Sequence, residues 1–164
     1  MLVVSDATPL NVLVRVGVVE VLHALYGRVV IPPAVERELS HSSTPADVRQ
    51  WLNSRPTWLA VIRPSNVVAA AGPDAGEREA IALALELGAD FLLADDKAAR
   101  SEARRLGVPV TGTIGVLQLA AGKNLLDLQS SLTRLAKIGF YIDPEVVRSA
   151  VEAHDLRCRP EDDR

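Results

Sequence analysis

Short apolar runs alternate with segments of helical periodicity along most of this chain. The apolar runs are rich in Val, Ile and Leu, and they predict strands at 2–5, 28–31, 58–62, 90–94 and 108–110. Apolar residues at helical spacing predict helices at 8–18, 19–25, 33–39, 46–52, 75–87, 97–106, 113–121, 125–138 and 143–154. Strands that alternate with helices predict an α/β fold with a mostly parallel central sheet covered on both faces.

Length and composition fit one domain. The 164 residues, 48% of them hydrophobic, are enough to bury a sizeable core. We expect a single domain over residues 1–156 and a polar, disordered C-terminal tail over 157–164. The one cysteine, Cys158, lies in that tail, which excludes a disulfide framework and a cysteine-based zinc site. No apolar run approaches the ~20 residues of a membrane span, so we expect no membrane association and a cytoplasmic location.

Charge and aromatic content restrict how the chain can bind nucleic acid. A net charge of −3 excludes binding driven by overall positive charge, and an aromatic content of 4% argues against a stacking platform for bases. Nucleic-acid contact therefore requires a local basic patch or a bound metal ion. The sequence has neither a G-x-S-x-G nucleophile elbow nor a glycine-rich phosphate loop.

Acidic residues lie in four short segments, mostly where a strand ends or a helix begins. They are Asp6, Glu38, Glu77 and the adjacent pair Asp95 and Asp96. Carboxylates gathered at one end of a parallel sheet have few uses besides holding a hard cation such as Mg²⁺ or Mn²⁺. If these side chains meet in space, we expect a metal-dependent enzyme that acts on phosphodiesters or phosphates.

Asp6 directly follows the first predicted strand. Thr8 is the predicted N-cap of the next helix and Pro9 its first residue, so Asp6 has no capping role. A carboxylate after an apolar strand costs free energy unless it has a partner such as a metal ion or a base. Asp6 is therefore the first candidate for a metal ligand.

Helical phase separates the two glutamates of the segment that begins at Pro33. Ala34, Val35 and Leu39 define the face that is predicted to be buried. Glu38 falls on this face, whereas Glu36 points away from it. Because an acid on a core-facing stripe is unusual, Glu38 is the candidate and Glu36 is predicted to be solvated.

Glu77 has two interpretations that the sequence leaves open. Asp74 and Glu77 fit a capping box, with Asp as the N-cap and Glu as the third helical residue. Glu77 also lies on the inward stripe that contains Ile81, while Glu79 lies at the edge of that stripe. A structural role and a role in metal binding are both compatible with this position.

One acid of the pair Asp95 and Asp96 can cap the helix that follows, which leaves the other free for chemistry. The sequence does not decide which is which. Lys97, Arg100 and Arg104 share one face of that helix. They form either a solvated flank or a clamp for phosphates that enter a metal site.

Five motifs in sequence order resemble those of PIN-domain proteins, in particular the prokaryotic DUF3368 branch related to VapC-type toxins. They are VSDATPL, IPPAVxxEL, GExEAIALA, LxDDKxAR and VTGTIGVL. Each motif alone is weakly specific, but the five occur in sequence order, and the resemblance extends over about residues 3–147. The resemblance implies a three-layer α/β/α fold with an acidic pocket that binds Mg²⁺ or Mn²⁺ and cleaves RNA. It also implies the toxin of a toxin–antitoxin pair, which would have an antitoxin as partner and would form a homodimer.

Site residues carry over motif by motif. Asp6, Glu38, Glu77 and Asp96 match the four acids of the family, and Asp95 lies beside the last of them. The third acid is Glu rather than the Asp common in VapC toxins, which changes its reach. We further expect hydrogen bonds to the acids or to phosphate from three hydroxyl side chains, those of Ser5, Thr8 and Thr113.

Two rival hypotheses belong to other classes. A phosphotransferase of the haloacid-dehalogenase type would need Asp-x-Asp after the first strand, and here Thr8 occupies the second Asp position. A catalytically weak or inert PIN-fold domain that binds nucleic acid or an antitoxin is the second rival. The presence of an acid at all four positions argues against it.

Overall fold

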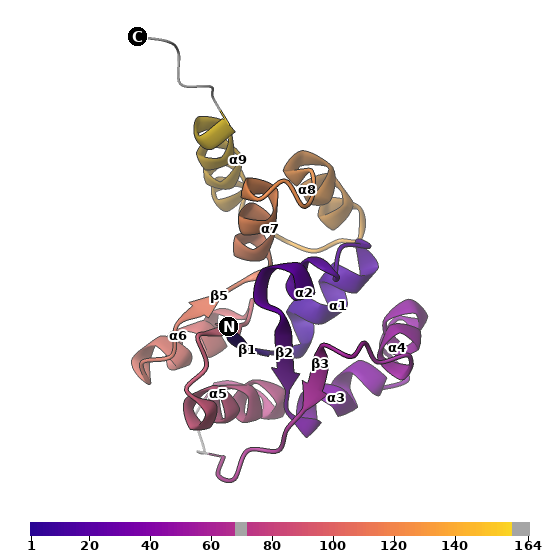
Figure 1. Ribbon diagram of the computed structural model, residues 1–164, viewed down its shortest axis with the longest axis vertical. Coiled ribbons are helices and arrows are strands. Elements are labelled where there is room, and N and C mark those ends of the chain that lie inside the picture. The colour runs from indigo at the N-terminus through magenta and orange to yellow at the C-terminus, as the bar shows by residue number, and fades with distance from the viewer. Residues whose placement is uncertain (68–71, 159–164) are drawn as a thin grey trace. The chain divides into compact units, whose positions relative to one another are not determined.

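The computed structural model describes residues 1–67 and 72–158, which divide into two compact units, 1–113 and 114–164 (Figure 1). The strands are β1 (Leu2–Ser5), β2 (Arg28–Ile31), β3 (Leu59–Val61), β4 (Phe91–Leu93) and β5 (Val110–Thr111). The helices of the first unit are α1 (Ala7–Arg15), α2 (Val21–Tyr26), α3 (Pro33–Ser40), α4 (Ala46–Asn53), α5 (Ala75–Leu87) and α6 (Lys97–Arg105). The remaining helices are α7 (Thr113–Gly122), α8 (Leu128–Lys137) and α9 (Pro144–Cys158).

The five strands form one parallel sheet in the order β3-β2-β1-β4-β5, which confirms the predicted α/β fold. Val4 is the central residue of the register, pairing with Val30 of β2 and Leu92 of β4. Val3 and Val4 point to opposite faces of the sheet, and both are fully buried. Strands buried on both faces explain why these segments are continuous apolar runs.

Helices α5 and α6 supply one side of the core. Their small and branched residues pack with strand residues in a single buried cluster: Val4, Val30, Ala80, Ile81, Leu83, Ala84, Ala89, Leu92, Ala94, Ala99, Ala103 and Val108. The helix α5 also lies beside α3 (Figure 1). Because alanine on α5 and α6 leaves little between backbone and sheet, both helices can approach the strands closely.

An aromatic group surrounds Trp58, just before β3. The Trp58 indole N–H donates to Glu20 at 3.1 Å. The His23 ring of α2 stacks on Trp58 with centroids 6.1 Å apart, and Trp51 of α4 lies 6.0 Å away. This group therefore ties α2 and α4 to the amino end of β3.

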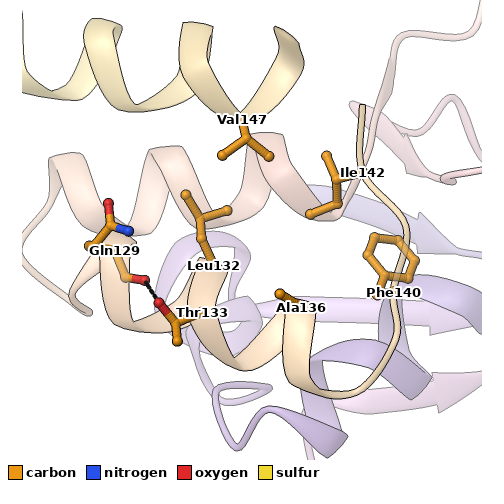
Figure 2. A pocket seen from close by; sticks show the side chains of 7 residues that line it. All are labelled: Gln129, Leu132, Thr133, Ala136, Phe140, Ile142 and Val147. Carbon is orange, nitrogen blue, oxygen red and sulfur yellow. Dashed lines mark hydrogen bonds between the residues drawn. The ribbon is translucent and has the colours of Figure 1, made fainter. Parts of the chain in front are cut away.

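The second unit contains α7, α8 and α9. The α8 helix begins at Leu128 rather than at 125 as predicted, because the Asp127 side chain caps it by accepting from Ser130 N at 2.6 Å. Between α8 and α9 lies a pocket of about 280 Å³, lined by Gln129, Leu132, Thr133, Ala136, Phe140, Ile142 and Val147. Figure 2 shows Val147 projecting from α9 toward α8 at this pocket.

Two predicted boundaries differ for local reasons. The prediction of Thr8 as an N-cap is wrong, because α1 begins at Ala7 and Asp6 occupies the N-cap position. The last strand lies at 110–111 instead of 108–110, since Pro109 has no N–H and contributes only its carbonyl, which accepts from Leu92 N at 2.8 Å.

The predicted tail overlaps the end of α9, and from residue 159 onward it lies outside the described residues. None of the described helices has the length and apolarity to cross a membrane.

Candidate active site

The sheet has its switch point between β1 and β4. From β1 the chain proceeds outward through β2 and β3, and it returns to the other side of β1 with β4. Asp6 follows β1, while Asp95 and Asp96 follow β4 by way of Ala94, and Asp6 N donates to Leu93 O at 2.9 Å. A crevice outside the carboxyl ends of strands at such a point is where open parallel sheets bind ligands.

The Asp6 carboxyl group is buried without a full set of partners. It occupies the N-cap position of α1 yet makes no capping hydrogen bond, and only 4% of the residue is exposed. Its Oδ1 finds no hydrogen-bond partner among the described residues. Burial raises the pKa of Asp6 to about 7; the Ala7 N–H lowers the pKa, while the carboxylates of Glu38, Glu77 and Asp74 raise it further. A buried oxygen in this state is expensive unless a cation occupies the space beside it.

Glu77 has the capping role that its sequence position allowed, and the charges of neighbouring acids act on it; a role in metal binding stays a prediction. It closes the predicted capping box with Asp74: Glu77 N donates to Asp74 Oδ1 at 2.9 Å, and Asp74 N donates to Glu77 Oε2 at 2.8 Å. The residue is buried at the first turn of α5. Burial raises the pKa of Glu77, the Asp74 N–H lowers it, and the charges of Asp74, Asp96 and Glu38 raise it. The capping box therefore fixes a glutamate that also faces the other acids.

Glu38 approaches this site from α3. The prediction that it lies on the buried face is wrong, since Ala34, Val35 and Leu39 are buried but Glu38 is exposed. Its carboxylate instead approaches the first turn of α5, where a Cβ on Gly76 would lie 3.1 Å from Glu38 Oε2. Partial burial, and then the charge of Asp74, raise the pKa of Glu38.

The two neighbouring glutamates that helical phase set aside have structural partners. Glu36 is half-buried and forms an ion pair with Arg55, so the expectation that it is simply solvated is wrong. Glu79 accepts a hydrogen bond from Ala34 N at 2.9 Å and lies 3.7 Å from Arg37. Because Ala34 N is at the start of α3, Glu79 holds that helix to α5 and so sets where Glu38 lies.

The acids after β4 separate into two environments. Asp96 caps α6, with its Oδ1 accepting from Ala98 N at 2.7 Å and Ala99 N at 3.0 Å, and its charge acts on Glu77. Asp95 points elsewhere and accepts from Thr113 N at 2.7 Å and Thr113 Oγ1 at 2.6 Å. The capping residue is thus the one that joins the other acids.

We call the carboxylates that interact electrostatically at this edge the acidic cluster: Asp6, Glu38, Asp74, Glu77 and Asp96. Asp74 was predicted only as a helix cap, and the capping box with Glu77 is what brings its carboxylate to the cluster. Across residues 1–67 and 72–158, no three acidic, histidine or cysteine side chains are placed closely enough to hold one ion between them. The chemistry of the cluster nevertheless fits a hard cation, because every donor is an oxygen and the buried Asp6 Oδ1 has no hydrogen-bond partner among these residues.

The other predicted contact residues are distributed around the site. The Ser5 hydroxyl is buried and donates to Asp6 O at 2.8 Å, and Thr8 is half-buried in the first turn of α1. Lys97 and Arg104 are exposed on α6. Arg100 is half-buried, and its Nη1 donates to Ala94 O at 3.0 Å; a contact between Arg100 and phosphate stays a prediction.

These features define an α/β protein with an acidic site at the carboxyl edge of a parallel sheet. Residues 2–155 match the family DUF3368, described as a PIN domain, and the chain belongs to this family. PIN domains are generally nucleases and usually use divalent metal ions.

The fold also occurs in a solved structure. A PilT N-terminus domain protein from the hyperthermophilic archaeon Sulfolobus solfataricus P2 aligns with a TM-score of 0.54 and 23% sequence identity, covering 80% of this chain and 94% of that chain. At this identity the likeness concerns the fold alone. No curated protein matches the sequence.

Proposed function

We propose that the protein is a Mg²⁺- or Mn²⁺-dependent endoribonuclease. The observation that carries the proposal is the buried Asp6 Oδ1, which has no hydrogen-bond partner in the described part of the chain and lies among four further carboxylates at the switch point of the sheet. Five acids at one edge repel one another, and a divalent cation relieves that repulsion. RNA as the substrate is supported by the motifs that resemble VapC-type toxins.

The position of each acid suggests its role in holding the ion. Asp6 and Asp96 would hold the ion from the ends of β1 and β4, while Glu38, Asp74 and Glu77 would complete its environment from α3 and α5. A divalent ion in such a site lowers the pKa of water and stabilises charge on phosphate oxygens. The capping box between Asp74 and Glu77 engages one oxygen of each side chain and fixes its direction.

Substrate approach requires positive charge near the acids. Phosphates are repelled by the acidic cluster until a cation is bound. The exposed Lys97 and Arg104 on α6 extend from the capping residue Asp96 and would attract the RNA backbone. Their side chains are suited to positioning phosphates rather than to reading bases.

The wider biological role is proposed on the same resemblance. We propose that the protein acts in the cytoplasm as the toxin of a toxin–antitoxin pair, forms a homodimer and is inhibited by a cognate antitoxin. The competing function is an inert PIN domain that only binds nucleic acid or an antitoxin. The observation that favours this alternative is that no three candidate ligands in the described part of the chain converge on one point.

Incubation with total RNA tests the activity. Purified protein with Mn²⁺ should fragment the RNA, and the same protein with a chelator should leave it intact. The Asp6→Asn variant, prepared in parallel, controls for contaminating ribonucleases. Cleavage that survives chelation or appears equally with Asp6→Asn would overturn the proposal.

Mn²⁺ should also stabilise the protein without any substrate. At a concentration of 100 times the Kd, a single bound ion adds about 2.7 kcal/mol to the free energy of unfolding. For a domain of this size that corresponds to a rise in Tm of roughly 5–10 °C. Differential scanning fluorimetry measures the rise, and Asp6→Asn should abolish it. An unchanged Tm in the wild-type protein would favour the inert alternative.

A further inference from the structure

Asp95 is held in a polar group of its own beside the acidic cluster. Both of its oxygens are engaged, Oδ1 by Thr113 N and Oδ2 by the Thr113 hydroxyl. Thr113 is fully buried. Burial raises the pKa of Asp95, while the hydrogen bonds from Thr113 and the charge of Arg100 lower it. The charge that acts on Asp95 is that of Arg100, whereas the charges that act on Asp6 and Glu77 are those of other acids.

Gly112 lies where the side chains of Arg100 and Asp95 approach the backbone most closely. A Cβ at residue 112 would lie 2.5 Å from Arg100 Nη1 and 2.7 Å from Asp95 Oδ1, so the side chains of Arg100 and Asp95 would have to move from their present positions. The backbone φ of Gly112 is not in the left-handed region, so the requirement for glycine comes from close approach alone.

We infer that Asp95, Arg100 and Thr113 form a polar lock that positions Asp96 in the acidic cluster, and that Gly112 is required for the lock to close. Asp96 directly follows the locked residue. The carbonyl oxygen of Ala94 accepts from Arg100, and the N–H of Ala94 donates to Thr111 O at 3.0 Å. Both backbone groups of Ala94, two residues before Asp96, are therefore hydrogen-bonded. The effect on metal binding rests on the proposed function; the lock itself does not.

Asp95 and Asp96 are adjacent and chemically identical in the sequence, but the lock gives them different hydrogen-bond partners and different roles. Asp96 keeps Oδ2 outside its capping bonds, which use Oδ1 alone. Asp95 has both oxygens committed to Thr113 and has a cation, Arg100, as neighbour. Asp95 is therefore a positioning residue.

Gly112→Ala tests the lock without altering any acid. We expect amide exchange at Ala98 and Ala99, the two donors to Asp96, to accelerate at least about tenfold relative to Ala103 in the same helix. Mn²⁺ binding, followed by electron paramagnetic resonance titration, should weaken about 10-fold to 100-fold, as is typical when a group that orients a ligand is lost.

Matched variants separate a local effect from general damage. Gly122→Ala is the control, because a Cβ there meets nothing within 4 Å, and it should behave as wild type. Thr113→Val removes the hydroxyl donor and should resemble Gly112→Ala, whereas Thr113→Ser keeps the donor and should restore wild-type values. If Gly112→Ala does not fold, the comparison of Thr113→Val with Thr113→Ser tests the lock in its place.

The outcomes are distinguishable from failure of the proposed function. Equal acceleration along all of α6, or exchange and Mn²⁺ affinity that stay within twofold in both Gly112→Ala and Thr113→Val, would overturn the lock. A wild-type protein that neither binds Mn²⁺ nor cleaves RNA would remove the proposed function, while the exchange comparison, which needs no metal, would still decide the lock.

Discussion

Asp6→Asn is expected to remove metal-dependent RNA cleavage while the fold is retained. The substitution keeps the shape of the side chain but eliminates the charge on a carboxyl group of a residue that is 4% exposed. One oxygen of this group is buried and has no hydrogen-bond partner within residues 1–67 and 72–158. Loss of a group that only orients a metal ligand typically costs 10-fold to 100-fold, so loss of a direct ligand should cost more than about 100-fold. Cleavage rates with saturating Mn²⁺ measure the effect.

The control for this result is Asp90→Asn. Asp90 is an exposed acid at the opposite end of the sheet, where its Oδ2 accepts from Leu2 N, and it does not belong to the acidic cluster. Its substitution should leave cleavage unchanged. An Asp6→Asn protein that cleaves at the wild-type rate would contradict the assignment of Asp6 as a ligand.

The metal-free protein is expected to lose stability as the pH rises from about 4 to about 7. Asp6 has a pKa of about 7 when folded and an ordinary value of 3.8, so the folded state holds a proton that the unfolded state has released across this window. Stability from Asp6 is therefore fully present below the unfolded pKa and is lost as the pH rises through the folded pKa. At about 1.4 kcal/mol per pH unit the loss is on the order of 4 kcal/mol.

Chemical denaturation in chelator at a series of pH values measures this loss. Asp6→Asn carries no titrating group at this position, so its free energy of unfolding should fall less with pH and should exceed that of the wild type at neutral pH. Glu38 and Glu77, whose pKa values are also raised, leave a smaller slope in the same direction. Parallel curves for the two proteins would show that Asp6 is not a strained, buried acid.

Periodicity and motif order were sufficient for the fold but not for every side chain. The apolar runs located all five strands, and the capping box of Asp74 and Glu77 was predicted as it occurs. Glu38 illustrates the limit, because helical phase alone gave it a buried position. Its actual surroundings depend on α5, whose Gly76 permits the close approach.

The pair Asp95 and Asp96 shows a different limit. Adjacent residues of the same type carry the same local signal, so their roles are set by what each meets in space. Thr113 lies 18 residues beyond Asp95, and no periodicity connects them. The role of Gly112 is equally hidden, since only the approach of Arg100 and Asp95 reveals why a side chain does not fit.

The aromatic group around Trp58 provides an intrinsic fluorescence signal for the first unit, residues 1–113. Both tryptophans of the chain, Trp51 and Trp58, belong to this group in the first unit, and residues 114–164 contain none. Tryptophan fluorescence therefore reports the unfolding of the first unit, whereas the circular dichroism of the helices reports the unfolding of both units. Coincident transitions by the two probes would mean that the units unfold as one cooperative body; separated transitions would mean that the helices after Thr113 melt independently.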